Sequence, residues 1–250
     1  LLVGGFPEAV QSFVNDTNIA TVRQIQSQIH EYYGVDASKY DHENRLKIRR
    51  IYDMIPSVLE NKKKRIVARD IEGMASKRFK DYQDEFDYLI ASGFALDVKA
   101  ISTPVFPLVE SMSKNLLKLY PNDVGMLTGI LFRNNINPIL NDECSVNLGT
   151  VYESVVAQEL KAHGFRLFYY DNKKNGEVDF LIDDYTQLSV LPLEVKSGKN
   201  YYQHSALNHF LTNKDYSVKR AIVFCNESTV EEKGGVIYMP VYNVMFLQAD

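Results

Sequence analysis

Two neighbouring segments, EVDFLIDD at 177–184 and LSVLPLEVKS at 188–197, carry charged residues inside apolar runs that are each long enough for one β-strand. Side chains alternate between the two faces of a strand, so Glu194 and Lys196 point the same way and their apolar neighbours point the other. If the strands pair in the simplest register, Asp179 joins them on that face. Two carboxylates and one ammonium are costly in a partly buried sheet unless they pair or bind a metal ion. The pattern therefore predicts one polar cluster on one face of the sheet.

A helix predicted at 150–164 adds a fourth residue, because Glu153 shares a helical stripe with apolar residues that would pack on the sheet. The carboxylates of Glu153, Asp179 and Glu194 are hard oxygen ligands that suit Mg²⁺ or Mn²⁺, and such ions accept substrate phosphate oxygens in their remaining positions. Lys196 would orient the attacking water or take its proton. We therefore predict metal-dependent phosphodiester hydrolysis with these four residues as the catalytic set. The alternative is a structural Glu–Lys pair on an exposed sheet face.

The rest of the chain from 113 to 250 has the pattern of an α/β domain. Further strands are predicted for RLFYYD, RAIVFC, GVIYMPV and VMFLQ, and a helix for QHSALNHFLTNK. The turn NKKNG suits a hairpin between the first two strands of the domain.

Two segments without this alternation come first. Residues 1–42 are predicted to be helical, with Thr17 or Asn18 as an N-cap and Gly34 as a helix end, and would form a lid or linker. Residues 43–112 follow the order helix, helix, helix, strand, which is the outline of a winged helix.

The helices of 43–112 have recognisable apolar stripes. In the first, the buried positions are predicted to be Leu46, Ile51, Ile55 and Leu59. In the third, the apolar stripe begins at Phe79, and Gly93 follows as a C-cap. The exposed positions of this third helix are predicted to be polar or acidic and would repel phosphates: Asp81, Gln83, Asp84, Glu85 and Asp87.

Charge is distributed unevenly along the chain. The net charge is -4, with 28 basic and 32 acidic residues. The stretch 45–80 alone has 12 Lys and Arg against 4 Asp and Glu, so the remainder has 28 − 12 = 16 against 32 − 4 = 28. A basic stretch can follow a phosphate backbone, and the alternative is a solvated helix face. The candidate DNA-binding residues are Arg45, Lys47, Arg49, Arg50, Lys62, Lys63, Lys64 and Arg65.

Composition excludes several classes of protein. With 45% hydrophobic and 24% charged residues the chain is neither disordered nor a membrane protein, and no uncharged apolar run reaches the length of a membrane-spanning helix. Nothing at the start resembles a signal peptide, so we expect a cytoplasmic protein. The two cysteines, Cys144 and Cys225, are far apart and lack a Cys/His cluster, which argues against a disulfide framework or a zinc site. The chain begins without methionine, and we expect it to be a piece of a longer protein.

Several motifs resemble known families. YESVVAQELKAHG, GEVDFLI and LEVKSG look like the core of the PD-(D/E)xK superfamily, whose motif would fall on Glu153, Asp179, Glu194 and Lys196. Nearly the whole chain, through GGFPEAV, IYDMIPSVL, FDYLIASGFALDVKAI and KLYPNDVGMLTGIL, resembles the C-terminal half of a group of prokaryotic AAA+ ATPases. The resemblance implies a missing N-terminal ATPase module that binds ATP, a winged-helix-like segment, and a C-terminal domain of unknown function with a restriction-endonuclease-like core and mixed central sheet. It also implies possible assembly into a homo-oligomer.

The chain departs from that pattern in ways that leave three functions open. It has no P-loop, since SGKN at 197–200 lacks the required glycine and Ser/Thr, so this chain should not itself hydrolyse ATP. The first function is a Mg- or Mn-dependent nuclease acting on DNA and attached to the ATPase. The second is an inactive nuclease fold that retains nucleic-acid binding. The third is a module that contacts proteins, through the winged-helix-like segment, and regulates the ATPase.

Overall fold

The computed structural model describes three stretches of the chain, namely 1–40, 45–141 and 148–249. These residues form two compact units, each built from two stretches: 1–97 with 118–158, called the first unit, and 98–117 with 159–250, called the second unit. The division predicted from the sequence into 1–42, 43–112 and 113–250 stays a prediction. Within the described ranges, no helix has the length and apolar character needed to cross a membrane.

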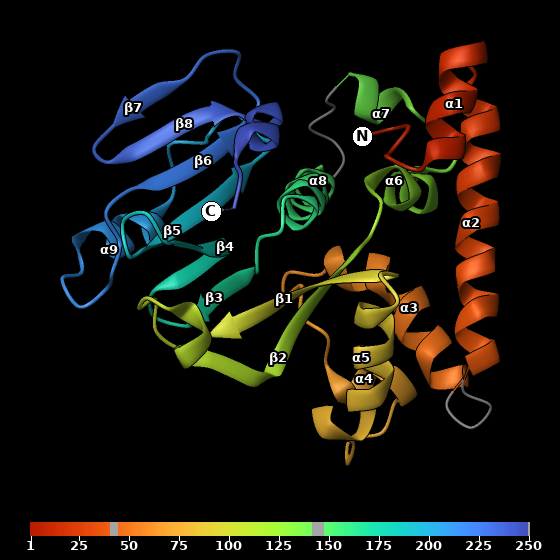
Figure 1. Ribbon diagram of the computed structural model, residues 1–250, viewed down its shortest axis with the longest axis horizontal. Helices are drawn as coiled ribbons and strands as arrows, with labels where there is room; N and C mark the ends of the chain where they lie inside the picture. The colour runs from red at the N-terminus through yellow and green to blue at the C-terminus, as the bar shows by residue number, and fades with distance from the viewer. Residues whose placement is uncertain (41–44, 142–147, 250) are drawn as a thin grey trace. The chain divides into compact units, whose positions relative to one another are not determined.

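The first unit is helical (Figure 1). Its elements are α1 (Pro7–Asp16), α2 (Ile19–Tyr40), α3 (Arg45–Leu59), α4 (Ala68–Glu72), η1 (Phe79–Tyr82), α5 (Gln83–Ala91), α6 (Val124–Phe132), α7 (Asn137–Leu140) and most of α8 (Gly149–Ala162). Figure 1 shows α1 alongside α2, and their contact buries Ala9, Val22 and Ile25 in a small core of their own. The helical N-terminal part expected from the sequence is thus present.

The boundaries of α2 confirm one predicted signal and overturn another. Asn18 is the N-cap, because its side-chain oxygen accepts a hydrogen bond from the Ala20 amide at 2.9 Å. Gly34 does not end the helix, which continues to Tyr40. Gly34 lies within reach of the Arg49 side chain, which a Cβ at this position would approach to 3.6 Å. Packing of α2 against a neighbouring helix therefore overrides the local preference of glycine for a helix end.

The apolar stripe of α3 is shifted by part of a turn from the one predicted. Ile51, Ile55 and Leu59 are buried as expected, but Leu46 is 62% exposed and Ile48 takes its place in the core. The apolar stripe predicted for the third helix is present, because Tyr82 of η1 and Phe86 and Leu89 of α5 are buried. Gly93 follows the helix with a φ of 74°, a conformation that favours glycine.

The first residues of the chain pack against the first turn of α6. Asp123 caps α6 by accepting the Met126 amide at 2.8 Å, and its other carboxylate oxygen accepts the Gly5 amide at 2.6 Å. Gly125, in the first turn of α6, has no room for a side chain, because a Cβ there would lie 2.6 Å from the Gly4 nitrogen. The segment before α1 therefore packs directly on the helix backbone.

An eight-stranded mixed sheet passes through the second unit in the order β2-β1-β3-β4-β5-β6-β8-β7. Its strands are β1 (Ala95–Ile101), β2 (Met112–Pro121), β3 (Phe168–Asn172), β4 (Gly176–Asp184), β5 (Ser189–Lys196), β6 (Ala221–Cys225), β7 (Glu231–Lys233) and β8 (Val236–Pro240). β3, β4 and β5 are antiparallel, whereas β1 pairs parallel with β3, and β5, β6 and β8 are parallel. The α/β region with a mixed sheet is therefore present as expected.

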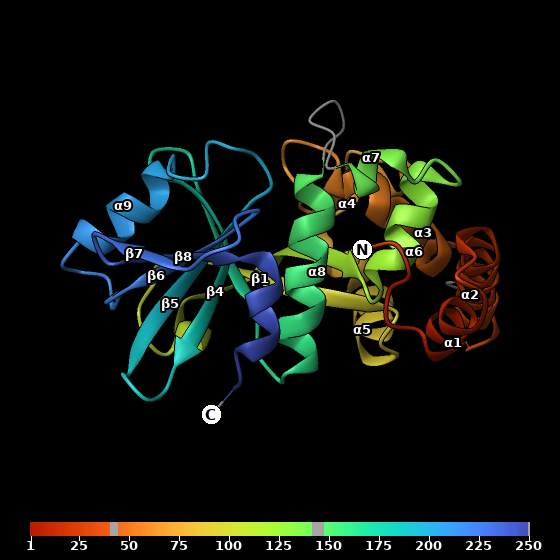
Figure 2. The ribbon, with the colours of Figure 1, turned by 90° about the horizontal axis from the view of Figure 1, so that it is seen from above.

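Helix α9 (Ser205–Thr212) covers one face of this sheet, as Figure 2 shows. Its apolar residues Ala206, Leu207 and Phe210 join a buried cluster with side chains from β4, β6 and β8. Cys225 belongs to this cluster and is a free, buried thiol, while Cys144 lies outside the described residues.

Two features of the second unit differ from the sequence-based expectation. The segment VMFLQ is not a strand: residues Val241–Phe246 form the 3-10 helix η3, although the segment is apolar. Phe246 is 73% exposed, so this apolar run is not buried in a sheet. In addition, β1 belongs to the central sheet through its pairing with β3, which sequence order alone did not indicate.

Candidate functional site

A β-bulge lies at the centre of the predicted site. Where β3 pairs with β4, two residues of β4, Asp179 and Phe180, oppose the single residue Tyr169. The residues on either side of the bulge, Val178 and Leu181, both belong to the core beneath α9. The alternation of side chains along β4 is therefore broken, and a bulge of this kind re-aims the side chain that it carries.

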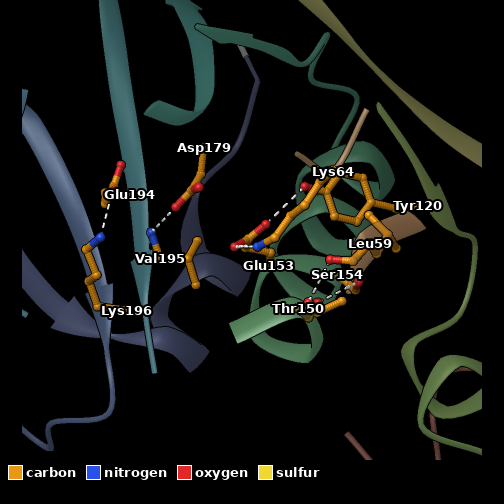
Figure 3. Close-up of polar contacts among 10 residues, drawn as sticks. All are labelled: Leu59, Lys64, Tyr120, Thr150, Glu153, Ser154, Asp179, Glu194, Val195 and Lys196. Atoms are coloured by element: carbon orange, nitrogen blue, oxygen red, sulfur yellow. Dashed lines mark hydrogen bonds and ion pairs between the residues drawn. The ribbon is translucent and has the colours of Figure 1, made fainter. Parts of the chain in front are cut away.

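The bulge separates Asp179 from the other two predicted residues. In Figure 3 the Asp179 and Val195 side chains project from one side of β5, and the Glu194 and Lys196 side chains project from the other. Asp179 Oδ2 accepts a hydrogen bond from the Val195 amide at 2.9 Å. Lys196 Nζ donates to Glu194 Oε1 at 2.6 Å. The structure thus brings Glu194 and Lys196 together, as alternation predicts, but directs Asp179 away from them, because the simple register does not hold at the bulge.

Glu194 lies on the buried face of the sheet. It pairs with Val223 of β6, which in turn pairs with Tyr238 of β8, so the three side chains share the face that α9 covers. Only 6% of Glu194 is exposed. Lys196, one alternation further along β5, is half-buried. The ion pair therefore runs from the interior toward the end of the strand.

Burial changes the acidity of this carboxyl group. The pKa of Glu194 is raised to about 7, chiefly by burial and to a smaller extent by the charge of Asp179, while Lys196 opposes the rise. Oε1 accepts from Lys196, whereas Oε2 is buried and has no hydrogen-bond partner among the described residues. A buried oxygen without a partner costs more free energy when the group is charged, which is one reason why the pKa of Glu194 is raised.

These residues do not fit a shared divalent metal site in this arrangement. Asp179 and Glu194 project from opposite sides of the sheet, and Glu194 is already bound to Lys196. Over residues 1–40, 45–141 and 148–249, no group of three or more His, Cys, Asp or Glu side chains could hold a metal ion. Mg²⁺ is usually held by one or two carboxylates that face a common point.

The fourth predicted residue, Glu153, belongs to the first unit and has partners there. Lys64 Nζ donates to Glu153 Oε1, and the Tyr120 hydroxyl donates to Oε2 at 3.2 Å (Figure 3). The Thr150 hydroxyl also donates to the Leu59 carbonyl at 3.1 Å and joins the first turn of α8 to the end of α3. Glu153 thus balances a lysine that we predicted to bind nucleic acid.

Acidic partners neutralise much of the basic stretch in space. The ion pairs are Lys47–Glu85 at 3.6 Å, Arg49–Asp53 at 3.5 Å, Arg50–Glu72 at 3.5 Å and Lys77–Glu72 at 3.8 Å. Glu85, which we expected to be exposed, is instead 4% exposed. The Glu85 carboxylate faces Lys47 of α3 and balances its charge. The excess of positive charge counted in the sequence is therefore smaller on the surface.

The other predicted nucleic-acid contacts are more accessible. Lys62 and Lys63 are exposed in the loop after α3, and Arg65 is half-buried. The side chain of Arg45 lies outside the described part of the chain. His204 is buried and shares a hydrogen bond of 2.6 Å with the Tyr238 hydroxyl.

Sequence reasoning passed over two arginines of the first unit. Arg23 on α2 and Arg133 after α6 line a common pocket, although they are far apart in the sequence and belong to no motif. The one available signal was Arg23 itself, a charged residue within the apolar pattern of α2, where Val22 and Ile25 are buried.

Comparison with known proteins identifies two domains of unknown function. The family model of DUF8612 matches residues 1–136, more than half of the chain. The model of DUF4143, a domain that commonly follows AAA ATPase modules, matches residues 148–244. No curated protein and no solved structure matches the chain.

Proposed function

The chain belongs to the DUF8612 family, and we propose that it is the C-terminal region of an AAA+ ATPase whose second unit is a regulatory module that does not cleave DNA. The DUF4143 match supports the ATPase context. In this proposal ATP is bound by an N-terminal module, and the sheet has a nuclease-like, PD-(D/E)xK core. The three helices α3, α4 and α5 support a winged-helix-like segment at 43–112, although its predicted strand, β1, pairs with β3 in the central sheet.

The observation that carries this proposal is the opposite orientation of Asp179 and the Glu194–Lys196 pair. The metal-dependent hydrolysis predicted for this site needs its acidic ligands and Lys196 around one point, so that the ions and the attacking water share the scissile phosphate. Here Asp179 instead fixes the β5 backbone at Val195. Lys196 neutralises Glu194. All three residues therefore have structural roles.

A metal-dependent nuclease is the second candidate, and one observation favours it. Glu194 Oε2 is buried without a partner among the described residues, as expected of a carboxylate that awaits a cation. Activity would require Asp179 to turn to the side of Glu194, and Mg²⁺ or Mn²⁺ would then be the cofactor.

The ion pairs of the first unit favour regulation through a protein contact over DNA binding. Lys47, Arg49 and Arg50 each face a carboxylate, which lowers the number of cations free to release counterions from DNA. The exposed Lys62 and Lys63 are the strongest remaining candidates for phosphate contacts.

A nicking assay tests the proposal directly. Supercoiled plasmid is incubated with the chain and Mn²⁺ or Mg²⁺, next to Asp179→Ala at equal concentration. We expect no nicking above background from either protein. Ion-dependent nicking by the native chain that is lost in Asp179→Ala would refute the proposal in favour of the nuclease.

A DNA titration at low and high salt distinguishes the two non-cleaving functions. We expect weak binding that Lys62→Gln with Lys63→Gln abolishes, or no binding. Tight, salt-sensitive binding would instead assign the chain to nucleic-acid recognition.

A further inference from the structure

A polar pocket in the first unit lies between α2 and the end of α6. Its volume is about 470 Å³, within the range of small-molecule sites. The polar residues that line it include Arg23, Gln26, Ser27, His30, Arg133 and Asn134. None of the described residues along its wall is acidic. The pocket thus combines two guanidinium groups with neutral hydrogen-bonding groups.

Arg23 is a cation that the surrounding fold only partly satisfies. The residue is 6% exposed. Its Nη1 donates to the Gly125 carbonyl at 2.8 Å, to Gln26 Oε1 at 2.8 Å and to the Thr128 hydroxyl at 3.0 Å. Nε and Nη2 are buried and have no hydrogen-bond partner among the described residues. Such unmet donors on a buried charge are costly, and an anion would satisfy them.

The nearby carboxylate does not meet this need. The charge of Asp123 opposes the lowering of the Arg23 pKa that burial causes. However, the two oxygens of Asp123 accept the backbone amides of Gly5 and Met126. Asp123 therefore offsets the charge of Arg23 without a hydrogen bond to it, and another anion can bind Nε and Nη2 of the guanidinium.

Arg133 supplies the second charge at the mouth of the pocket. It is exposed and has a φ of 51° and a ψ of −123°, a strained backbone for a residue other than glycine. Strain of this kind is concentrated at binding sites. A Cβ on Gly129, one turn earlier, would lie 3.3 Å from Arg23 Nη1, so the lack of a side chain there leaves room for the arginine.

We propose that this pocket binds a small phosphorylated molecule, with its phosphate group between Arg23 and Arg133. Arginine matches the geometry of phosphate oxygens because its N–H groups form a planar fork. Arg133 is exposed and meets the phosphate directly, whereas Nε and Nη2 of Arg23 are buried and reach it after a shift of the side chain. The amide and hydroxyl groups of the wall accommodate the rest of the ligand.

Isothermal titration of the whole chain tests this proposal, with inorganic phosphate and glycerol phosphate as probes and sodium chloride at matched ionic strength as reference. We expect saturable binding of both probes, and tighter binding of the ester because the pocket extends beyond one phosphate group. Arg133→Gln should weaken binding about tenfold, the loss expected for one hydrogen bond to a charged group. The matched control is Lys214→Gln, an exposed cation outside the pocket, which should bind as the native chain does.

Thermal unfolding of the same proteins provides a second readout. Phosphate should raise the unfolding temperature of the native chain more than chloride does, and raise that of Arg133→Gln less. Arg23→Gln should lose the effect as well. If that variant does not fold, Arg133→Gln decides the question. Equal effects of phosphate and chloride, or equal phosphate affinity of Arg133→Gln and the native chain, would overturn the proposal. Binding of phosphate but not of the ester would also overturn it, because the pocket would then hold only the free ion.

Discussion

Replacing Glu194 by glutamine should change how the stability of the second unit depends on pH. The pKa of this carboxyl is raised from 4.5 to about 7, chiefly by burial. The folded state therefore holds its proton more tightly than the unfolded state. The stabilisation by this proton is complete below pH 4.5 and is lost as the pH rises through about 7. Glutamine has nearly the same shape and no charge, so the stability of Glu194→Gln lacks this dependence on pH.

The magnitude follows from the displacement of the pKa. The difference between about 7 and 4.5 is about 2.5. Each pKa unit corresponds to about 1.4 kcal/mol, so ionising Glu194 costs the fold on the order of 3 kcal/mol. The group is 6% exposed, so screening by solvent does not reduce this value greatly. Between pH 5 and pH 8 the native chain should therefore lose about 2–3 kcal/mol relative to Glu194→Gln, because a part of the effect is already lost at pH 5.

Urea unfolding at a series of pH values measures this difference, with a chelator present so that no metal ion alters the titration. Hydrogen exchange of β5 peptides reports the same loss locally and separates it from unfolding of the first unit. Glu232→Gln, which removes an exposed carboxylate from β7, is the control and should follow the native chain. A constant difference between Glu194→Gln and the native chain from pH 5 to pH 8 would refute the reasoning.

Two further substitutions test the packing of the first unit. Gly125→Ala should lower the free energy of unfolding by about 1–3 kcal/mol, because its Cβ would lie 2.6 Å from the backbone nitrogen of Gly4. Gly198→Ala is the control, because no atom lies within 4 Å of its Cβ, and it should change this free energy little in the same urea titration. Lys64→Met should lower the free energy of unfolding by about 3 kcal/mol, because it leaves the carboxylate of Glu153 buried without its cation. A loss below about 1 kcal/mol in thermal unfolding would show that the ion pair contributes little to stability.

Local patterns in the sequence predict most of the helices and strands, because residues close together in the sequence determine where these elements begin and end and which faces they bury. Alternation places Glu194 and Lys196 on one face of β5, and their ion pair confirms that they do lie together. The N-cap Asn18 and the glycine after α5, Gly93, were also found from residue chemistry alone. In each case one or two residues and their immediate neighbours decide the conformation.

Features that depend on distant partners could not be predicted in this way. The bulge at Asp179 arises from the pairing of β4 with β3, and single-strand alternation contains no sign of it. Gly34 continues a helix because α2 packs on its neighbours, and Glu85 is buried because it faces Lys47. The pocket between Arg23 and Arg133 likewise exists only once α2 and α6 are packed together.

Titration with Mn²⁺ shows whether the bulge keeps Asp179 away from the Glu194–Lys196 pair. Electron paramagnetic resonance of free Mn²⁺ counts the ions that the chain binds, and it requires neither DNA nor catalysis. We predict that the native chain, Asp179→Asn and Glu194→Gln bind Mn²⁺ equally weakly. A stoichiometric site in the native chain that is lost in both variants would show that the two carboxylates share a metal ion and that the bulge does not keep them apart.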